Sequence, residues 1–143
     1  MRITTKGEYG LRLMTELARD FGQGPLPLSE ISRRQSLPLS YLEQIVAPLR
    51  KAGLVKSKRG ARGGYFLAQR PEKISMGEIM RALGVTIAPV ECISEEINAQ
   101  CCEMKESCST RVVWQRVRDD IAQILDSTKL ADLIPLERED EPW

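Results

Sequence analysis

The sequence predicts a mostly helical α+β fold, a winged helix-turn-helix domain followed by a long C-terminal dimerisation helix. Three patterns carry this prediction: two short amphipathic helices around a tight turn, a basic glycine-rich segment between two short apolar runs, and a long amphipathic stretch near the C-terminus. We expect four parts: the DNA-binding domain (1–84), a cysteine-rich cluster-binding loop (85–108), the dimerisation helix region (109–134) and a disordered acidic tail (135–143).

Composition and charge limit the possible functions. Residues 1–84 hold 15 Lys and Arg against 7 Asp and Glu, a net charge of +8, whereas residues 85–143 hold 6 against 13, a net charge of −7. Such a division predicts a head that binds a polyanion and a body that does not. There is no apolar run of membrane-spanning length and no signal-peptide pattern, so we expect a cytoplasmic protein without a membrane partner.

The N-terminal patterns predict helices. Thr4 or Thr5 can cap a first helix that runs to about Asp20, with a core face that includes Leu13, Met14 and Leu17. Glycines and prolines in FGQGPLP end it, and a short helix follows over 29–34 with Ile31 in the core.

The next helix is the predicted recognition helix. Ser40 and Glu43 form a capping-box pattern, and apolar residues recur at three- and four-residue spacing up to Leu49. Its outward face begins with Ser40, Tyr41 and Gln44, which we expect to contact DNA. Pro48 lies inside the helix, where it removes one backbone hydrogen bond and can kink the helix.

The predicted wing follows Gly53, which ends the recognition helix. Two short apolar runs flank the turn KSKRGARGG, whose cations are Lys56, Lys58, Arg59 and Arg62. Long cationic side chains in such a turn can reach phosphates or enter a minor groove. A basic run is often only a solvated face, but its place after a helix pair favours DNA binding.

Two further helices are expected. Ser75 and Glu78 form a second capping box, and Ser109 or Thr110 can cap a helix to about Asp126. In the latter, an apolar seam recurs at gaps of three, four and three residues: Trp114, Val117, Ile121 and Ile124. The helix either packs on its own domain or forms a symmetric homodimer; the small head favours the dimer.

All four cysteines lie in one polar segment, residues 92–108, which we call the cysteine segment: Cys92, Cys101, Cys102 and Cys108. In a chain without histidine, this clustering indicates a metal or iron–sulfur site. Tetrahedral zinc is an alternative, although the paired knuckles of zinc sites are absent. A thiol redox enzyme is disfavoured because there is no C-x-x-C, and we expect no enzymatic activity.

Several motifs together resemble the IscR-type iron–sulfur cluster regulators, which are dimeric winged-helix transcription factors. They are MRITTKGEYGLR, LPLSEIS, LPLSYLEQ, LRKAGLVKSKRGARGGYFLA and CSTRVVW, and the resemblance spans residues 1–134. It implies that the helix over 40–52 enters the major groove and that Arg59 enters the minor groove of a partly palindromic DNA duplex. It also implies that Glu43 modulates which DNA sites are accepted.

The resemblance further implies an iron–sulfur cluster, commonly 2Fe–2S, held by Cys92, Cys102 and Cys108. The best-known members have a histidine three residues after the last cysteine, where this chain has Arg111, which cannot ligate. Glu8 of the partner subunit and Cys101 of the same chain remain as possible fourth ligands.

The expected function is therefore a DNA-binding regulator, a repressor, that senses cluster status and controls iron–sulfur cluster biogenesis genes. The alternative is a winged-helix regulator with zinc or with cluster-free thiol sensing, for example of cysteine metabolism. Relatives of that second kind lack such a crowded cysteine loop.

Overall fold

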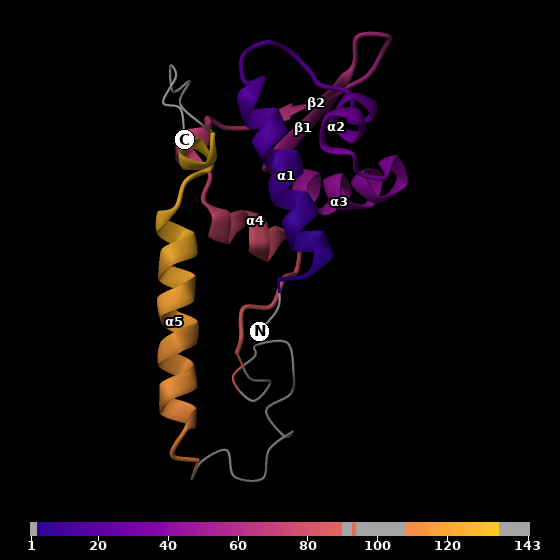
Figure 1. Ribbon diagram of the computed structural model, residues 1–143. Coiled ribbons are helices and arrows are strands. Elements are labelled where there is room, and N and C mark those ends of the chain that lie inside the picture. Colours follow the sequence, from indigo (N-terminus) through magenta and orange to yellow (C-terminus); the bar gives the residue numbers. More distant parts are fainter. Residues whose placement is uncertain (1–2, 90–92, 94–107, 135–143) are drawn as a thin grey trace, which may run out of the picture.

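The computed structural model describes residues 3–89, 93 and 108–134. In chain order the elements are α1 (Thr5–Arg19), α2 (Leu28–Gln35), α3 (Leu39–Lys51), β1 (Val55–Lys58), β2 (Gly64–Leu67), η1 (Pro71–Lys73), α4 (Met76–Ala82), α5 (Arg111–Ser127) and η3 (Leu130–Leu133). Four α-helices, α1 to α4, and a two-stranded antiparallel sheet form the head, and a long helix extends beside it (Figure 1). The predicted winged helix-turn-helix is confirmed. No helix in this part of the chain is long and apolar enough to span a membrane.

The core of the head lies between α1, α2 and α3. Of the two candidate caps, it is Thr4 that caps α1, by accepting a hydrogen bond from the Gly7 N–H at 3.2 Å. Leu13, Met14 and Ile31 are fully buried. The four apolar residues of α3 that recur at helical spacing are buried as well: Leu42, Ile45, Val46 and Leu49.

The capping box expected at the start of α3 is wrong. The helix begins at Leu39, with Pro38 at the N-cap, and no side chain caps it. Ser36 adopts a left-handed conformation with φ of 53°, and extended Pro38 then directs the chain into the helix two residues earlier than a Ser40 cap predicts. Ser40 therefore lies inside the first turn, where its backbone is helical and cannot serve as a cap.

Pro48 does not end α3. The helix continues to Lys51, and the Pro48 carbonyl accepts a hydrogen bond from the Ala52 N–H at 3.0 Å. The proline removes one N–H near the C-terminal end of the helix, away from the first turns that carry the candidate DNA contacts.

The predicted wing, residues 55–67, is a β-hairpin with Val55 opposite Leu67 and Lys58 opposite Gly64. A Cβ at Gly63 would lie 2.2 Å from the Lys58 carbonyl oxygen, so this turn requires glycine. The loop before α2 extends the sheet, because Leu26 and Tyr65 exchange backbone hydrogen bonds of 2.8 and 2.9 Å. The wing is therefore attached to the α1–α2 loop as well as to α3.

The chain returns to the head after α5. The predicted Ser75–Glu78 capping box is present in full, and Ser75 also forms a β-bridge with Lys129. The Leu130 N–H donates to the Ile74 carbonyl at 2.7 Å, and Leu130 is fully buried in the core of the head. These contacts hold the C-terminal end of α5 against the head.

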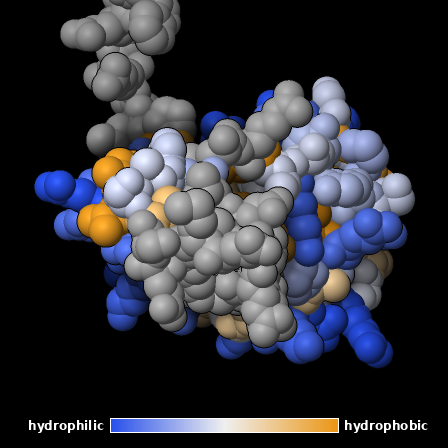
Figure 2. All heavy atoms as spheres, turned by 90° about the horizontal axis from the view of Figure 1, so that it is seen from below, coloured by the Kyte–Doolittle hydropathy of each residue, from blue (hydrophilic) through white to orange (hydrophobic). Residues whose placement is uncertain are grey.

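The rest of α5 extends away from the head as a separate arm (Figure 1). It begins after Thr110, as expected, but the Thr110 side chain makes no capping hydrogen bond. No residue of α5 is buried, and Val112, Val113 and Ile124 are more than half exposed. In Figure 2, which views the molecule from below, apolar side chains reach the surface on the side where α5 lies.

Candidate nucleic-acid interface and cysteine segment

The first turns of α3 present the residues expected to contact DNA. Ser40, Glu43 and Gln44 are exposed and Tyr41 is half-buried. The Tyr41 ring meets the Tyr9 ring edge-to-face, with centroids 5.5 Å apart, so α1 supports its position. The structure brings the four side chains together at one end of α3.

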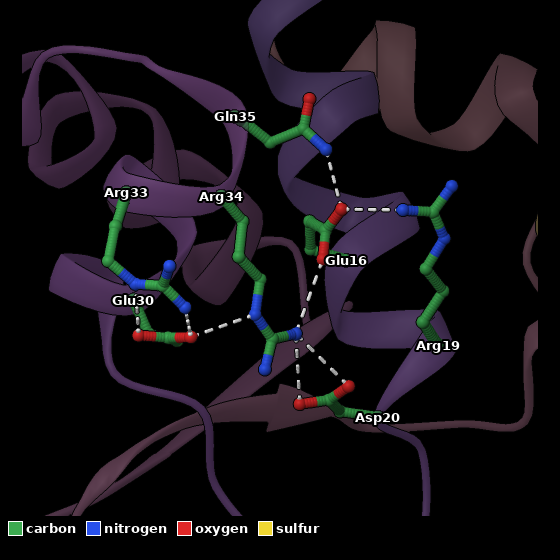
Figure 3. A network of polar contacts seen from close by, with 7 residues as sticks. All are labelled: Glu16, Arg19, Asp20, Glu30, Arg33, Arg34 and Gln35. Carbon is green, nitrogen blue, oxygen red and sulfur yellow. Dashed lines mark hydrogen bonds and ion pairs between the residues drawn. The ribbon is translucent and has the colours of Figure 1, made fainter.

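A buried carboxylate connects α1 to α2. The Glu16 side chain is only 3% exposed, and it accepts a hydrogen bond from Arg19 at 2.8 Å. From α2, Arg34 approaches it at 3.4 Å and Gln35 also donates to it (Figure 3). A buried charge is tolerated only where partners of this kind satisfy it. The contacts hold α2 in place beneath the recognition helix.

Arg34 joins this carboxylate to two more acids. It lies 3.2 Å from Asp20 and 3.0 Å from Glu30, and Arg33 also binds Glu30 (Figure 3). The hydrogen bonds that Arg34 donates to Asp20 and, next in size, to Glu30 raise the pKa of Arg34. Hydrogen bonds from Arg33 and then Arg34 lower the pKa of Glu30 to about 2. We call these seven residues the Glu16 network: Glu16, Arg19, Asp20, Glu30, Arg33, Arg34 and Gln35.

Sequence reasoning did not identify this network, although one signal was present. Glu16 lies three residues after Leu13 and one before Leu17, and an acid on that apolar face of α1 indicates a buried ion pair. Its partners lie 18 and 19 positions further along the chain, and periodicity cannot identify them.

The wing presents unneutralised positive charge. Lys56, Lys58, Arg59 and Arg62 are all exposed. Within the described residues, none of the four forms an ion pair. Four cationic side chains on one hairpin, none with an ion pair to the described residues, are suited to contact phosphates.

The cysteine segment meets α5 at both of its described ends. Ile93 is 5% exposed, and its carbonyl accepts a hydrogen bond of 3.0 Å from Arg118 of α5. Cys108 lies shortly before Arg111, the first residue of the same helix. Arg118 lies about two turns into α5. Cys92, Cys101 and Cys102 fall outside the described residues.

Cys108 has the chemistry of a metal ligand. Its sulfur lies 3.2 Å from the Thr110 hydroxyl oxygen and is partly exposed. Hydrogen bonds from the Thr110 hydroxyl and from the Thr110 and Arg111 backbone lower the pKa of the Cys108 thiol. Because the thiolate is the ligating form, this end of the cysteine segment fits an iron–sulfur cluster.

Glu8 lies on the first turn of α1 with its side chain 60% exposed. It lies 3.8 Å from Arg12 of the same helix, a weak exposed pair that leaves its carboxylate accessible. No three potential ligands gather within the part of the chain that the structure describes.

The apolar seam of α5 faces away from its own head. Near its end α5 packs on α4 through Asp126, which binds Arg81 at 2.9 Å. Asp126 follows Val117 by nine positions, which at about 100° per residue places the two on opposite sides of the helix. Trp114 and Ile124 are 39% and 63% exposed, and Val117 and Ile121 are half-buried. The alternative that the seam packs on its own domain is thus disfavoured.

Comparison with known proteins gives the family. The model of the Rrf2 family, described as iron-dependent transcriptional regulators, matches residues 3–135. This chain belongs to the Rrf2 family. Rrf2 members with this winged helix-turn-helix are transcription regulators rather than enzymes, so the expectation of a non-enzymatic regulator is confirmed.

Relatives of this chain include proteins named CymR and IscR. The regulator CymR of Bacillus subtilis is 47% identical over 93% of this chain and 89% of its own length. Its solved structure, described as that of the global cysteine regulator, superposes with a TM-score of 0.76 over 93% of this chain and 95% of that one. The structure of T. potens IscR is 42% identical, with a TM-score of 0.71 over 92% of this chain and 85% of the other.

Proposed function

We propose that this Rrf2 protein is a homodimeric DNA-binding repressor that senses an iron–sulfur cluster bound by its cysteine segment. The observation that supports this proposal most directly is that all four thiols lie, in the sequence, between the DNA-binding head and the exposed arm α5. The description of the family as iron-dependent regulators supports it. We expect the regulated genes to include those for cluster biogenesis.

The head supplies the DNA contacts in this proposal. Ser40, Tyr41 and Gln44 read the major groove from the start of α3, with Glu43 tuning which sites are accepted. On the wing, Arg59 enters the minor groove, while Lys56, Lys58 and Arg62 contact phosphates. Exposed polar residues at the start of a recognition helix, next to unpaired wing cations, suit this division of roles.

The arm α5 supplies the dimer. Two copies joined along the seam of Trp114, Val117, Ile121 and Ile124 carry one head each, so we expect a partly palindromic operator with recognition helices about 34 Å apart. Burying the seam removes exposed apolar area from water, which favours association.

Cys92, Cys102 and Cys108 hold the cluster, commonly 2Fe–2S. The fourth ligand is Glu8 of the partner subunit or Cys101 of the same chain. The bound cluster supplies an oxidant- and iron-sensitive group whose presence favours one arrangement of the dimer. A ligand from the first turn of α1 would connect the cluster to the helix that supports Tyr41.

The test is purification without oxygen, followed by the visible absorption spectrum and by iron and sulfide analysis. We expect a coloured protein with equal amounts of iron and sulfide. DNA sites selected from a random library are then titrated with cluster-loaded and cluster-free protein. Colourless protein that still binds one selected operator would exclude the cluster and retain the DNA-binding part of the proposal.

A second candidate is a regulator of cysteine metabolism that works without a cluster, by thiol sensing or with zinc. The observation in its favour is the 47% identity to CymR, whose structure is described as that of a global cysteine regulator. This candidate predicts protein without iron after reconstitution, and operator binding that responds to thiol oxidation or zinc. The iron analysis therefore separates the two candidates.

A further inference from the structure

A mostly apolar pocket of about 360 Å³ lies between the end of α1, the α1–α2 loop and the wing. One wall is Phe21, which is 43% exposed although it is a large aromatic residue. Residues of β2 border the pocket on another side, and Leu26 continues this side through its bridge to Tyr65. We call this hollow the Phe21 pocket. Its volume is at the lower end of the range for small-molecule sites, which are lined mainly by apolar and aromatic side chains.

Two charged side chains lie at the Phe21 pocket, and they are not equivalent. Asp20 is already paired with Arg34 at 3.2 Å (Figure 3). Lys58 is exposed and has no ion pair with any residue that the structure describes. The unmatched charge at the pocket is therefore positive.

The surface next to the pocket is also positively charged. Phe21 also borders a second, polar hollow that is lined by Arg70 and Lys73, and neither cation forms an ion pair within the described residues. An anion that approaches Phe21 from either side meets cations, whereas the nearest acid is neutralised by Arg34.

From this geometry we infer that the Phe21 pocket binds a small organic anion, with its flat apolar body between Phe21 and the β2 side of the pocket and its carboxylate at Lys58. Aromatic walls favour a planar ring system, because stacked and edge-on ring contacts add to the burial of apolar area. The size of the pocket limits the ligand to about two fused rings.

The location of the pocket also predicts an effect on DNA binding. This prediction rests on the proposed function. The carboxylate and a DNA phosphate would compete for the same ammonium group, since Lys58 is one of the proposed phosphate contacts. Bound anion should therefore weaken DNA binding by the wing.

The test of the site uses 2-naphthoate as the anion and 2-naphthamide as its neutral, equally shaped control. Each is titrated into the full-length protein and followed by amide chemical shifts in two-dimensional NMR. We expect saturable shifts at residues around the pocket, with the acid binding about two- to fivefold more tightly than the amide, the size of an exposed ion pair.

Three variants sharpen the test. Phe21→Ala should weaken both probes about tenfold, because it removes one aromatic wall. Lys58→Gln should remove the preference for the acid and leave the amide unaffected. Lys56→Gln makes the same charge change on the same strand outside the pocket, so it should leave both affinities unchanged. Circular dichroism checks that each variant is folded.

The absence of saturable shifts, or shifts centred away from the Phe21 pocket, would overturn the site. An unchanged acid-to-amide ratio in Lys58→Gln would overturn the role of Lys58. The consequence for DNA is measured separately, by operator titration with and without saturating naphthoate. A weakening that occurs in the wild type and not in Lys58→Gln supports competition, and equal DNA affinities in the wild type refute it.

Discussion

In the head, the environment of several charged side chains differs from what their neighbours in the sequence suggest. Glu16 is an acid on the apolar face of α1, and it is stable there because three donors from two helices surround it. Glu30, in contrast, is held by exposed arginines that lower its pKa. The exposed wing cations, which form no ion pair with the part of the chain that the structure describes, remain available to a ligand.

Glu30 predicts a pH dependence of stability. Its pKa of about 2 in the folded protein lies below the ordinary value of 4.5, so its contribution to stability is complete above pH 4.5 and is lost as the pH falls towards 2. Glu30→Gln should lower the midpoint of denaturant unfolding at pH 6 and have little effect near pH 2. Urea titrations of both proteins at the two pH values measure this; an equal difference at both would contradict it.

Arg59 and Lys56 predict different losses of DNA binding. Arg59→Ala should weaken specific binding and change the preference at one A·T-rich position in each half-site, because a minor-groove contact is lost. Lys56→Ala should weaken binding to all sequences alike and reduce the salt slope by about one unit. Titrations against operators mutated position by position distinguish the two, and uniform losses for both variants would refute the separate roles.

At the scale of elements, α5 behaves differently from the helices of the head. Helices α1, α3 and α4 bury an apolar face against one another, whereas α5 buries none of its residues. Its end is fixed by Asp126 and by Leu130, and its seam lies on the other side of the helix. An exposed seam of this kind is expected at a subunit interface.

The α5 seam predicts a monomeric variant. Replacing Val117 and Ile121 by Asp should prevent dimer formation, because charges cannot be buried in the seam without partners. Binding to a two-half-site operator should fall at least tenfold, while the head stays folded. Val112→Asp is the control, because this valine is 69% exposed and lies off the seam. Sedimentation measures the outcome; a dimeric Val117→Asp/Ile121→Asp variant would mean that the seam is misassigned.

At the scale of the whole molecule, the cysteine segment connects a basic head to an acidic body. Its described ends lie beside α5, where Ile93 bonds to Arg118 and Cys108 precedes the helix. Glu8, on the first turn of α1, belongs to the head. A cluster shared between the segment of one subunit and the head of its partner would couple cluster loss to the positions of the heads.

The fourth ligand can be tested on this basis. We expect Glu8→Ala to shift the visible spectrum of reconstituted protein and to speed cluster loss, while Cys101→Ala leaves both nearly unchanged. The reason is that Cys101 and Cys102 are adjacent, and neighbouring side chains in extended chain diverge. The rates of cluster loss are compared by following the visible absorbance over time after exposure to oxygen. Loss of the spectrum in Cys101→Ala alone would assign Cys101 instead.

The sequence alone predicted most features that depend on neighbouring residues, although not the cap of α3. Helix periods, the Thr4 cap and the Ser75–Glu78 capping box, the glycine turn of the wing and the apolar residues of α3 were all correctly identified. Each of these depends on contacts a few residues apart, so spacing and turn chemistry are sufficient.

Only the tertiary structure decided where these elements meet. It moved the start of α3 to Leu39, because the left-handed Ser36 and extended Pro38 set the direction of entry. It buried Glu16 among donors from α2, bridged Leu26 to Tyr65 to form the Phe21 pocket, and turned the α5 seam away from α4. Except for the entry into α3, these contacts join residues far apart in the chain, and their energies depend on burial and direction that no local pattern contains.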